Sequence, residues 1–142
     1  MQFMLSMIGA EPDFDQVPPE MMQKIMDEMN RFNHELDAAG AYVVGGGLQL
    51  AANARTVKFP LEGESVVSDG PFAETKEQLA GFWIIEAKDI DEAVAWAQKA
   101  PIQGASIEVR PFGAPIEFKP GEHQMSADEL LEAAKGNPPA SS

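Results

Sequence analysis

The side chains best suited to chemistry are concentrated in residues 69–83, DGPFAETKEQLAGFW. This segment places two carboxylates, those of Asp69 and Glu74, close in sequence to the ammonium group of Lys76. A carboxylate can accept a proton from a substrate and a lysine can stabilise an anion, so the segment could form the rim of a pocket. A carboxylate acts as a base at neutral pH only where burial raises its pKa, so this function requires a partly buried loop.

The same segment also has a purely structural interpretation. Asp69-Gly70-Pro71 is a turn signal, because an aspartate side chain can accept a hydrogen bond from the backbone that follows it. The turn would place Phe72, a large apolar side chain, on a loop that connects two strands and has a solvated face. The residue types alone favour this interpretation over the catalytic one.

Other candidate motifs are weaker. The glycines at 45–47 lack the spacing of a dinucleotide-binding motif and precede no helix, so a bulge or bend in a strand is expected. His34 points away from the apolar face of its predicted helix, and His123 has no metal-ligand spacing to another residue. The chain has no cysteine. We therefore expect neither a metal site nor a cofactor. The eight methionines are typical of a pliable core, with a promiscuous apolar pocket as the alternative.

Length and charge restrict the class of protein. A chain of 142 residues corresponds to one domain, and its 44% hydrophobic residues can supply a packed core. The net charge of −13 repels phosphate backbones and anionic lipids, so neither nucleic acid nor a membrane surface is an expected partner. The apolar run 1–9 lacks the basic flank of a signal peptide and indicates a strand, which together with the absence of cysteine favours a cytoplasmic location.

Hydrophobic periodicity predicts an α+β fold of the ferredoxin-like split βαβ type with an inserted β-hairpin. Residues 113–142 read as a C-terminal arm that carries a short helix at 126–135. Expected strands are 2–8, 42–44, 82–85 and 107–109, the hairpin is 56–59 with 65–67, and expected helices are 18–39 and 89–100. Both helices of this plan cover one face of the sheet. The other face would expose apolar side chains, so we expect two copies to pair face to face as a homodimer or a larger even oligomer.

The run DGPFAETKEQLAGF closely resembles the signature of the YCII-related, or DGPF-domain, family. The stretches QFMLSMI, FNHELDAAG, LQLAANARTVKF and IEVRPF agree with it, so the resemblance covers residues 1–112. It implies a ferredoxin-like domain paired as a dimeric α+β barrel, in a family of small cytosolic bacterial proteins. Most members have no assigned function.

Members of the wider family carry a histidine on the first helix, which with an aspartate is taken as a catalytic pair for elimination-type chemistry. Counting back from Gly40, that position is Met29 in this chain, and a frequent glutamate after the second strand is replaced by Gly46. Residues 69–76, in contrast, do match the family sequence. Asp69, Gly70, Pro71, Phe72, Glu74 and Lys76 match the family loop, and Arg110 matches more weakly. From the chemistry of their side chains, Asp69 and Glu74 are the candidate catalytic residues, and Gly70, Phe72, Lys76 and Arg110 are the candidate ligand-binding residues.

The expected function is therefore a homodimer that binds an unknown small molecule in a pocket between sheet and helices, rimmed by residues 69–76. If it is an enzyme, it is expected to catalyse a cofactor-independent, lyase- or isomerase-type proton transfer. The alternative is a non-catalytic accessory or regulatory protein that acts through protein contacts.

Overall fold

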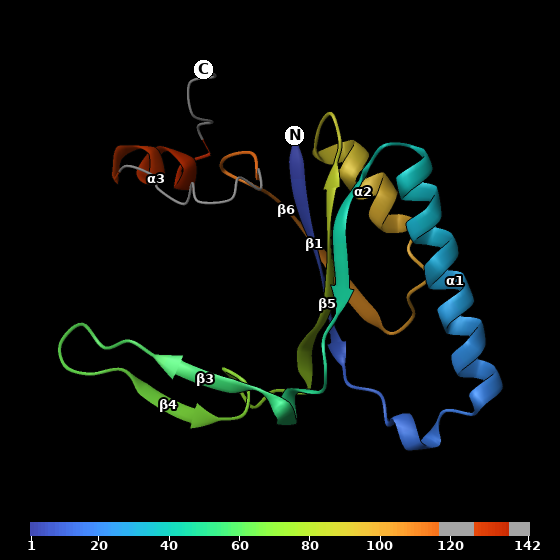
Figure 1. The fold of residues 1–142 in the computed structure, drawn as a ribbon, viewed down its shortest axis with the longest axis horizontal. Coiled ribbons are helices and arrows are strands. Elements are labelled where there is room, and N and C mark those ends of the chain that lie inside the picture. Colours follow the sequence, from blue (N-terminus) through green and yellow to red (C-terminus); the bar gives the residue numbers. More distant parts are fainter. Residues whose placement is uncertain (117–126, 137–142) are drawn as a thin grey trace.

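Alternating apolar residues along four strands build one antiparallel sheet in the computed structural model, which describes residues 1–116 and 127–136. The strands are β1 (Gln2–Ala10), β2 (Tyr42–Gly47), β5 (Glu77–Glu86) and β6 (Ala105–Pro111), in the order β2-β5-β1-β6. Helices α1 (Pro19–Ala38) and α2 (Ile90–Gln98) both lie on one face of this sheet (Figure 1). The α+β class and the order β-α-β, hairpin, β-α-β are confirmed.

The inserted hairpin consists of β3 (Arg55–Lys58) and β4 (Val66–Asp69), which pair only with each other. Two short 3-10 helices, η1 (Phe14–Gln16) and η2 (Ala51–Asn53), lie before α1 and before β3. The arm contributes α3 (Ala127–Ala134), which confirms the short helix, although its expected capping residue lies outside the described residues. No helix in the described part of the chain has the length and apolar character needed to cross a membrane.

Local sequence signals set the helix ends. Proline at position 19 is tolerated at the start of α1 because the first N–H groups of a helix have no partner within it. The helix stops at Gly40, whose φ of 71° is a left-handed conformation that glycine adopts without steric cost. The side chain of Asp89 accepts a hydrogen bond of 2.9 Å from the backbone N–H of Glu92 and caps α2.

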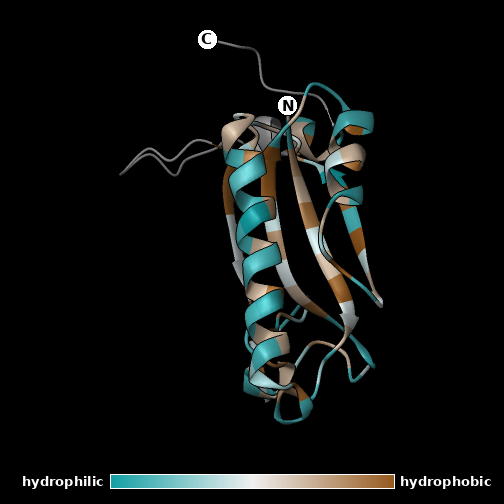
Figure 2. Ribbon diagram, turned by 90° about the vertical axis from the view of Figure 1, so that its right-hand side faces the viewer, coloured by the Kyte–Doolittle hydropathy of each residue, from teal (hydrophilic) through white to brown (hydrophobic). Residues whose placement is uncertain are grey.

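The core lies between the sheet and the two helices. Phe3 and Leu5 of β1 alternate with residues of the opposite face, and the same alternation holds for Trp83 and Ile85 of β5. Figure 2 shows the long helix α1 as hydrophilic along its exposed side, with apolar strand segments behind it. The buried core residues are Phe3, Leu5, Phe32, Leu36, Ala41, Trp83, Ile85, Ala87 and Ala93.

All four strands of the sheet are longer than their sequence patterns predicted, and the extensions of β2 and β5 change the interpretation of a motif. The expected interruption of β2 at the triple glycine is wrong, because β2 pairs with β5 as far as Gly47 and its irregularity lies between Tyr42 and Val44. The backbone hydrogen bonds of β5 support the glycines that have no side chains of their own to pack. Likewise, β5 begins at Glu77, inside the predicted loop, because that end of the strand pairs with Gly9 and Ala10 of β1.

Among the described residues, no helix or strand covers the face of the sheet opposite α1 and α2. Val44, Ile84 and Met4 lie in register across β2, β5 and β1 on this face. The β3-β4 hairpin projects from one end of the sheet on this side, and α3 lies on the same side at the other end (Figure 1). The hairpin exposes large apolar side chains: Val57, Phe59, Leu61, Val66 and Val67.

The packing of α1 makes a stability prediction. Leu36 is fully buried against the sheet, so Leu36→Ala should lower the free energy of unfolding by about 2 to 5 kcal/mol. Met21 lies on the same helix with half of its surface exposed, so Met21→Ala should change that free energy by no more than about 0.5 kcal/mol. Chemical denaturation of the two variants and the parent measures both values. Equal effects would contradict the placement of the core.

Candidate functional site

The first half of the 69–76 loop is fixed by contacts with the hairpin. Asp69 forms an ion pair with Arg55 across β3 and β4, and both side chains are largely exposed. Gly70 has a φ of 97°, its N–H donates to the carbonyl of Ala54 at 2.8 Å, and its own carbonyl accepts a bond of 2.9 Å from the hydroxyl of Thr56. The Asp-Gly turn is therefore a structural joint, as the residue types indicated.

The second half of the loop is held by the side chains of Gln78 and Thr75, and the hydroxyl of Thr75 donates to the carbonyl of Glu77 at 2.5 Å. The Nε2 atom of Gln78 donates to the carbonyls of Ala73 and Thr75 at 2.9 and 3.0 Å. These bonds hold the backbone, while the side chains between them face solvent. Phe72 is 84% exposed, and Glu74 and Lys76 are exposed as well.

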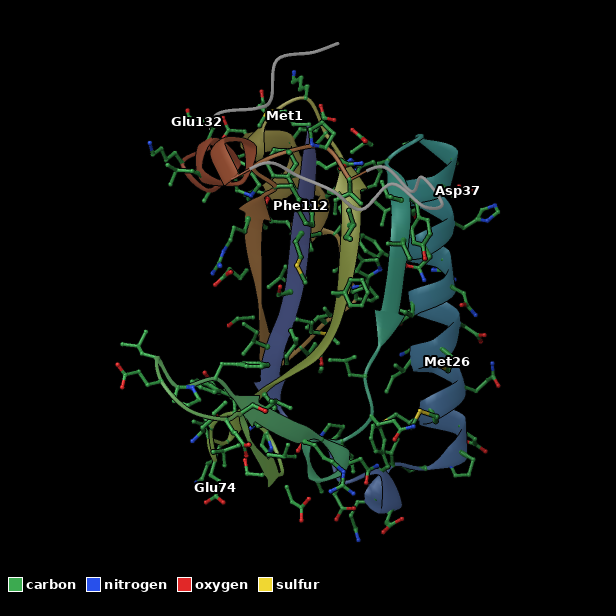
Figure 3. All side chains as sticks on the ribbon, turned by 60° about the vertical axis from the view of Figure 1, so that its left-hand side comes forward. Met1, Met26, Asp37, Glu74, Phe112 and Glu132 are labelled. Carbon is green, nitrogen blue, oxygen red and sulfur yellow. The ribbon has the colours of Figure 1, made fainter. Side chains whose placement is uncertain are left out.

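The predicted catalytic carboxylates are thus not withdrawn from water in the described chain. Figure 3 shows Glu74 below the hairpin, directed away from the sheet. Asp69 is 87% exposed, and its partner in the ion pair is an exposed arginine. General-base catalysis by either group requires burial that the single chain does not supply.

Arg110 lies apart from the loop. It pairs in register with Met4 on β1, whereas the start of β5, which follows the loop, pairs with Ala10. Six residues along a strand correspond to about 20 Å. Phe112, two residues after Arg110, and Glu74 lie at opposite ends of the molecule (Figure 3). Arg110 instead forms an ion pair of 2.5 Å with Glu108, so the structure does not assemble one site from these candidates.

Two loop residues, Pro71 and Phe72, border a wide hollow of about 610 Å³ at the base of the hairpin. Its other walls come from β3, from the segment around η2 and from the start of β5. Asp69, Glu74 and Lys76 do not line it. The lining residues are Leu48, Gln49, Leu50, Ala51, Asn53, Ala54, Arg55, Thr56, Val57, Pro71, Phe72, Gln78 and Leu79.

A second, smaller hollow of about 150 Å³ lies between α1 and the sheet. The pocket expected between sheet and helices therefore exists, but no residue of the 69–76 loop lines it, which corrects the expected rim. It is lined by Met7, Met29, Asn33, Gly45, Gly46, Gly47, Gly81, Phe82 and Trp83. Gly46 and Gly47 are exposed on the edge strand β2, so the hollow opens to solvent there.

Glycines make the floor of this hollow. A Cβ atom on Gly45 would lie 2.9 Å from Cδ1 of Trp83, and one on Gly81 would lie 2.9 Å from the carbonyl oxygen of Gly46. Both contacts are too short for a side chain. A Cβ atom on Gly47, in contrast, would have no heavy atom within 4 Å. The triple glycine therefore lets the indole lie close to the sheet and leaves space beside it.

The wall of the hollow is the indole of Trp83, which is held from two sides. Its Nε1–H donates to Oδ1 of Asn33 at 2.8 Å, and its ring meets that of Phe32 edge to face, with centroids 5.3 Å apart. Sequence reasoning named neither Asn33 nor Trp83 as a site residue. The local signals were Met29 and Gly46, which the resemblance placed at the positions of a family histidine and a family glutamate, and both line the hollow.

Within the described residues, no group of three or more histidine, cysteine, aspartate or glutamate side chains is arranged to hold a metal ion. His34 is exposed on α1, as its position on the helix predicted. His123 lies outside the described residues.

Comparison with known proteins gives two matches. The profile of the YCII-related domain matches residues 1–113, so the match ends before α3. An uncharacterised protein of Rhizobium meliloti (strain 1021) is 49% identical over 103 residues, which are 70% of this chain and 80% of that protein.

The contacts of the loop predict which of its residues matters for stability. Gly70→Ala should lower the free energy of unfolding by about 1 to 2 kcal/mol, because a side chain strains a backbone at positive φ. Asp69→Asn should change it little, because an ion pair between two exposed side chains contributes little. Thermal and chemical unfolding measure both variants. A larger loss for Asp69→Asn would show that the carboxylate, and not the turn, holds the loop.

Proposed function

The chain belongs to the YCII-related domain family, and we propose that it is a homodimer that binds a small molecule in the hollow between α1 and the sheet. The presence of this hollow is the main support for the proposal. An apolar cavity of about 150 Å³ is large enough to bind benzene, and this hollow has an opening at the sheet edge. Small-molecule sites are typically concave and apolar with a few polar groups, which is the composition found here.

The chemistry of the lining supports binding rather than proton transfer at this place. No side chain that lines the hollow is ionisable, and Met29 occupies the position at which the family resemblance implied a histidine. A thioether neither accepts nor releases a proton near neutral pH. A lyase- or isomerase-type reaction would instead need Asp69 or Glu74, and it would require that subunit pairing buries one of them.

The uncovered face of the sheet supports the homodimer. The strand order β2-β5-β1-β6 with both helices on one side agrees with the ferredoxin-like plan of dimeric α+β barrels. In such a dimer, the row of Val44, Ile84 and Met4 would meet its equivalent on a second copy. At about 25 cal/mol per Å², burying several hundred Å² of apolar surface on each copy offsets the cost of association.

The hairpin would add to this interface. Phe59 and Leu61 are 80% and 106% exposed, and the hairpin projects on the same side as the uncovered face (Figure 1). Apolar residues at the tip of a protruding hairpin are costly in water, and a second copy seated on the uncovered face would lie within its reach.

A second candidate function rests on Phe72. This large apolar side chain is 84% exposed on a loop whose backbone is held by Thr56 and Gln78. A rigid, exposed aromatic residue is a common anchor for protein contacts. A non-catalytic accessory protein would use this anchor, and Phe72→Ala would then abolish capture of a partner protein without changing ligand binding.

The dimer is tested by light scattering at micromolar concentration. The parent chain should give about twice the 15.3 kDa mass of one chain, or a larger even multiple. Ile84→Lys places a charge in the centre of the proposed interface and should shift the mass toward that of one chain. Asn30→Lys places the same charge on the exposed side of α1 and should leave the dimer intact. A monomeric parent protein would overturn the proposal.

The ligand site is tested by thermal shift with a library of small aromatic and carbonyl compounds. Gly47→Val should abolish the stabilisation by any binder, because its side chain enters space that is empty in the parent. Asn30→Val is the matched control: it adds the same side chain at an exposed position of α1 that does not line the hollow. Its binding should equal that of the parent. Stabilisation that survives Gly47→Val would place the ligand elsewhere.

A further inference from the structure

The orientation of the Asn33 amide is determined by its partner. The indole nitrogen of Trp83 is a hydrogen-bond donor only, so the atom of Asn33 that bonds to it at 2.8 Å must be the oxygen. The NH₂ group of the amide therefore points to the other side. Among the described residues, no acceptor bonds to this group. Asn33 lines the hollow between α1 and the sheet, so its NH₂ group is a hydrogen-bond donor available to a ligand there.

The other side chains around the hollow favour an aromatic and uncharged ligand. Met7 and Met29 supply thioethers, which make favourable contacts with aromatic rings, and Trp83 supplies a ring. No cationic side chain lines the hollow, and the chain carries a net charge of −13. Both facts disfavour an anion.

The floor of the hollow favours a flat ligand. Gly45, Gly46 and Gly47 of β2, together with Gly81 of β5, present backbone without side chains, while α1 covers them from above. The space between a helix and a bare sheet surface is a slot. A planar ring fills such a slot with contacts on both of its faces, whereas a branched aliphatic group of the same volume does not.

We propose that the ligand is a neutral, planar aromatic compound that bears a carbonyl or similar acceptor, which receives a hydrogen bond from Nδ2 of Asn33. This inference rests on the proposed function, since it names the class of molecule that the hollow selects. An aromatic ligand without an acceptor leaves the NH₂ group of Asn33 buried and unpaired. That loss weakens binding by about tenfold or more.

The test compares acetophenone with ethylbenzene, which share a phenyl ring with a two-carbon substituent but differ in the carbonyl oxygen. Dissociation constants come from titrations followed by NMR through the indole N–H signal of Trp83. Acetophenone should bind about tenfold or more tightly than ethylbenzene. Benzoate, which adds a negative charge to the same ring, should bind more weakly than acetophenone.

Two variants and a control test whether the preference for acetophenone arises at Asn33 in this hollow. Asn33→Asp keeps an oxygen for the indole of Trp83 but replaces the donor with a carboxylate oxygen, so it should remove the preference for acetophenone. An unchanged indole signal in the free variant shows that the wall of the hollow is intact. Gly47→Val should remove binding of both compounds, and Asn30→Val, at an exposed position outside the hollow, should retain it. If Asn33→Asp does not fold, the difference in affinity between the two compounds for the parent protein still tests whether the ligand needs an acceptor.

The outcomes separate the two proposals. A preference for acetophenone that is lost in Asn33→Asp supports the inference. Equal binding of both compounds, abolished by Gly47→Val, overturns the ligand class but keeps the hollow as a binding site. Binding of neither compound, or binding unaffected by Gly47→Val, overturns the hollow as the site and the inference with it.

Discussion

The close approach of the Trp83 indole to the glycines of β2 is the contact on which this structure depends. Trp83 joins β5 to α1 through its hydrogen bond to Asn33 and its edge-to-face contact with Phe32. It can do so because Gly45 has no side chain, and a Cβ atom there would lie 2.9 Å from the indole. One residue thus connects the sheet to the long helix, closes one end of the core and forms the wall of the hollow. A hydrogen bond to an indole that is 5% exposed also orients the amide that faces the hollow.

The same arrangement gives the two faces of the sheet different surroundings. Because both helices pack on one face, no helix or strand among the described residues covers the second face, and the hairpin and α3 project at its two ends (Figure 1). The hairpin exposes large apolar side chains, among them Phe59 and Leu61, on the side of this face. The proposed dimer removes that surface from water without changing the helix side, where the proposed ligand site lies. Assembly and binding would then use opposite faces of one sheet.

Hydrogen bonds explain the structural role of the DGPF segment. Gly70 provides the positive φ of the turn, Thr56 and Gln78 hold the backbone on either side, and Phe72 is left in solvent. The residue types that suggested acid–base chemistry are thus explained in the single chain by a rigid connection between β4 and β5. Its exposed phenylalanine is better suited to a contact than to catalysis.

The sequence by itself determined the order of elements, the ends of the helices, the α+β class and the family. Periods of 2 and 3.6 residues, proline at the start of α1 and glycine at its end are local signals, because they act within one turn or one strand. The DGPF run likewise identified a turn that the structure contains. Local signals failed where pairing decided the outcome: β2 continues through its glycines and β5 begins at Glu77, because neighbouring strands supply the hydrogen bonds.

Only the tertiary structure decided the candidate site. Asn33 and Trp83 are 50 residues apart in the chain, and nothing in either segment indicates that their side chains meet. The register of β2 against β5 places Gly45 opposite Trp83, and the register of β6 against β1 places Arg110 far from the loop with which the family resemblance grouped it. A sequence pattern states which face of an element is buried. Which side chains share a hollow depends on how non-adjacent strands align, and that alignment is fixed only when the whole core packs.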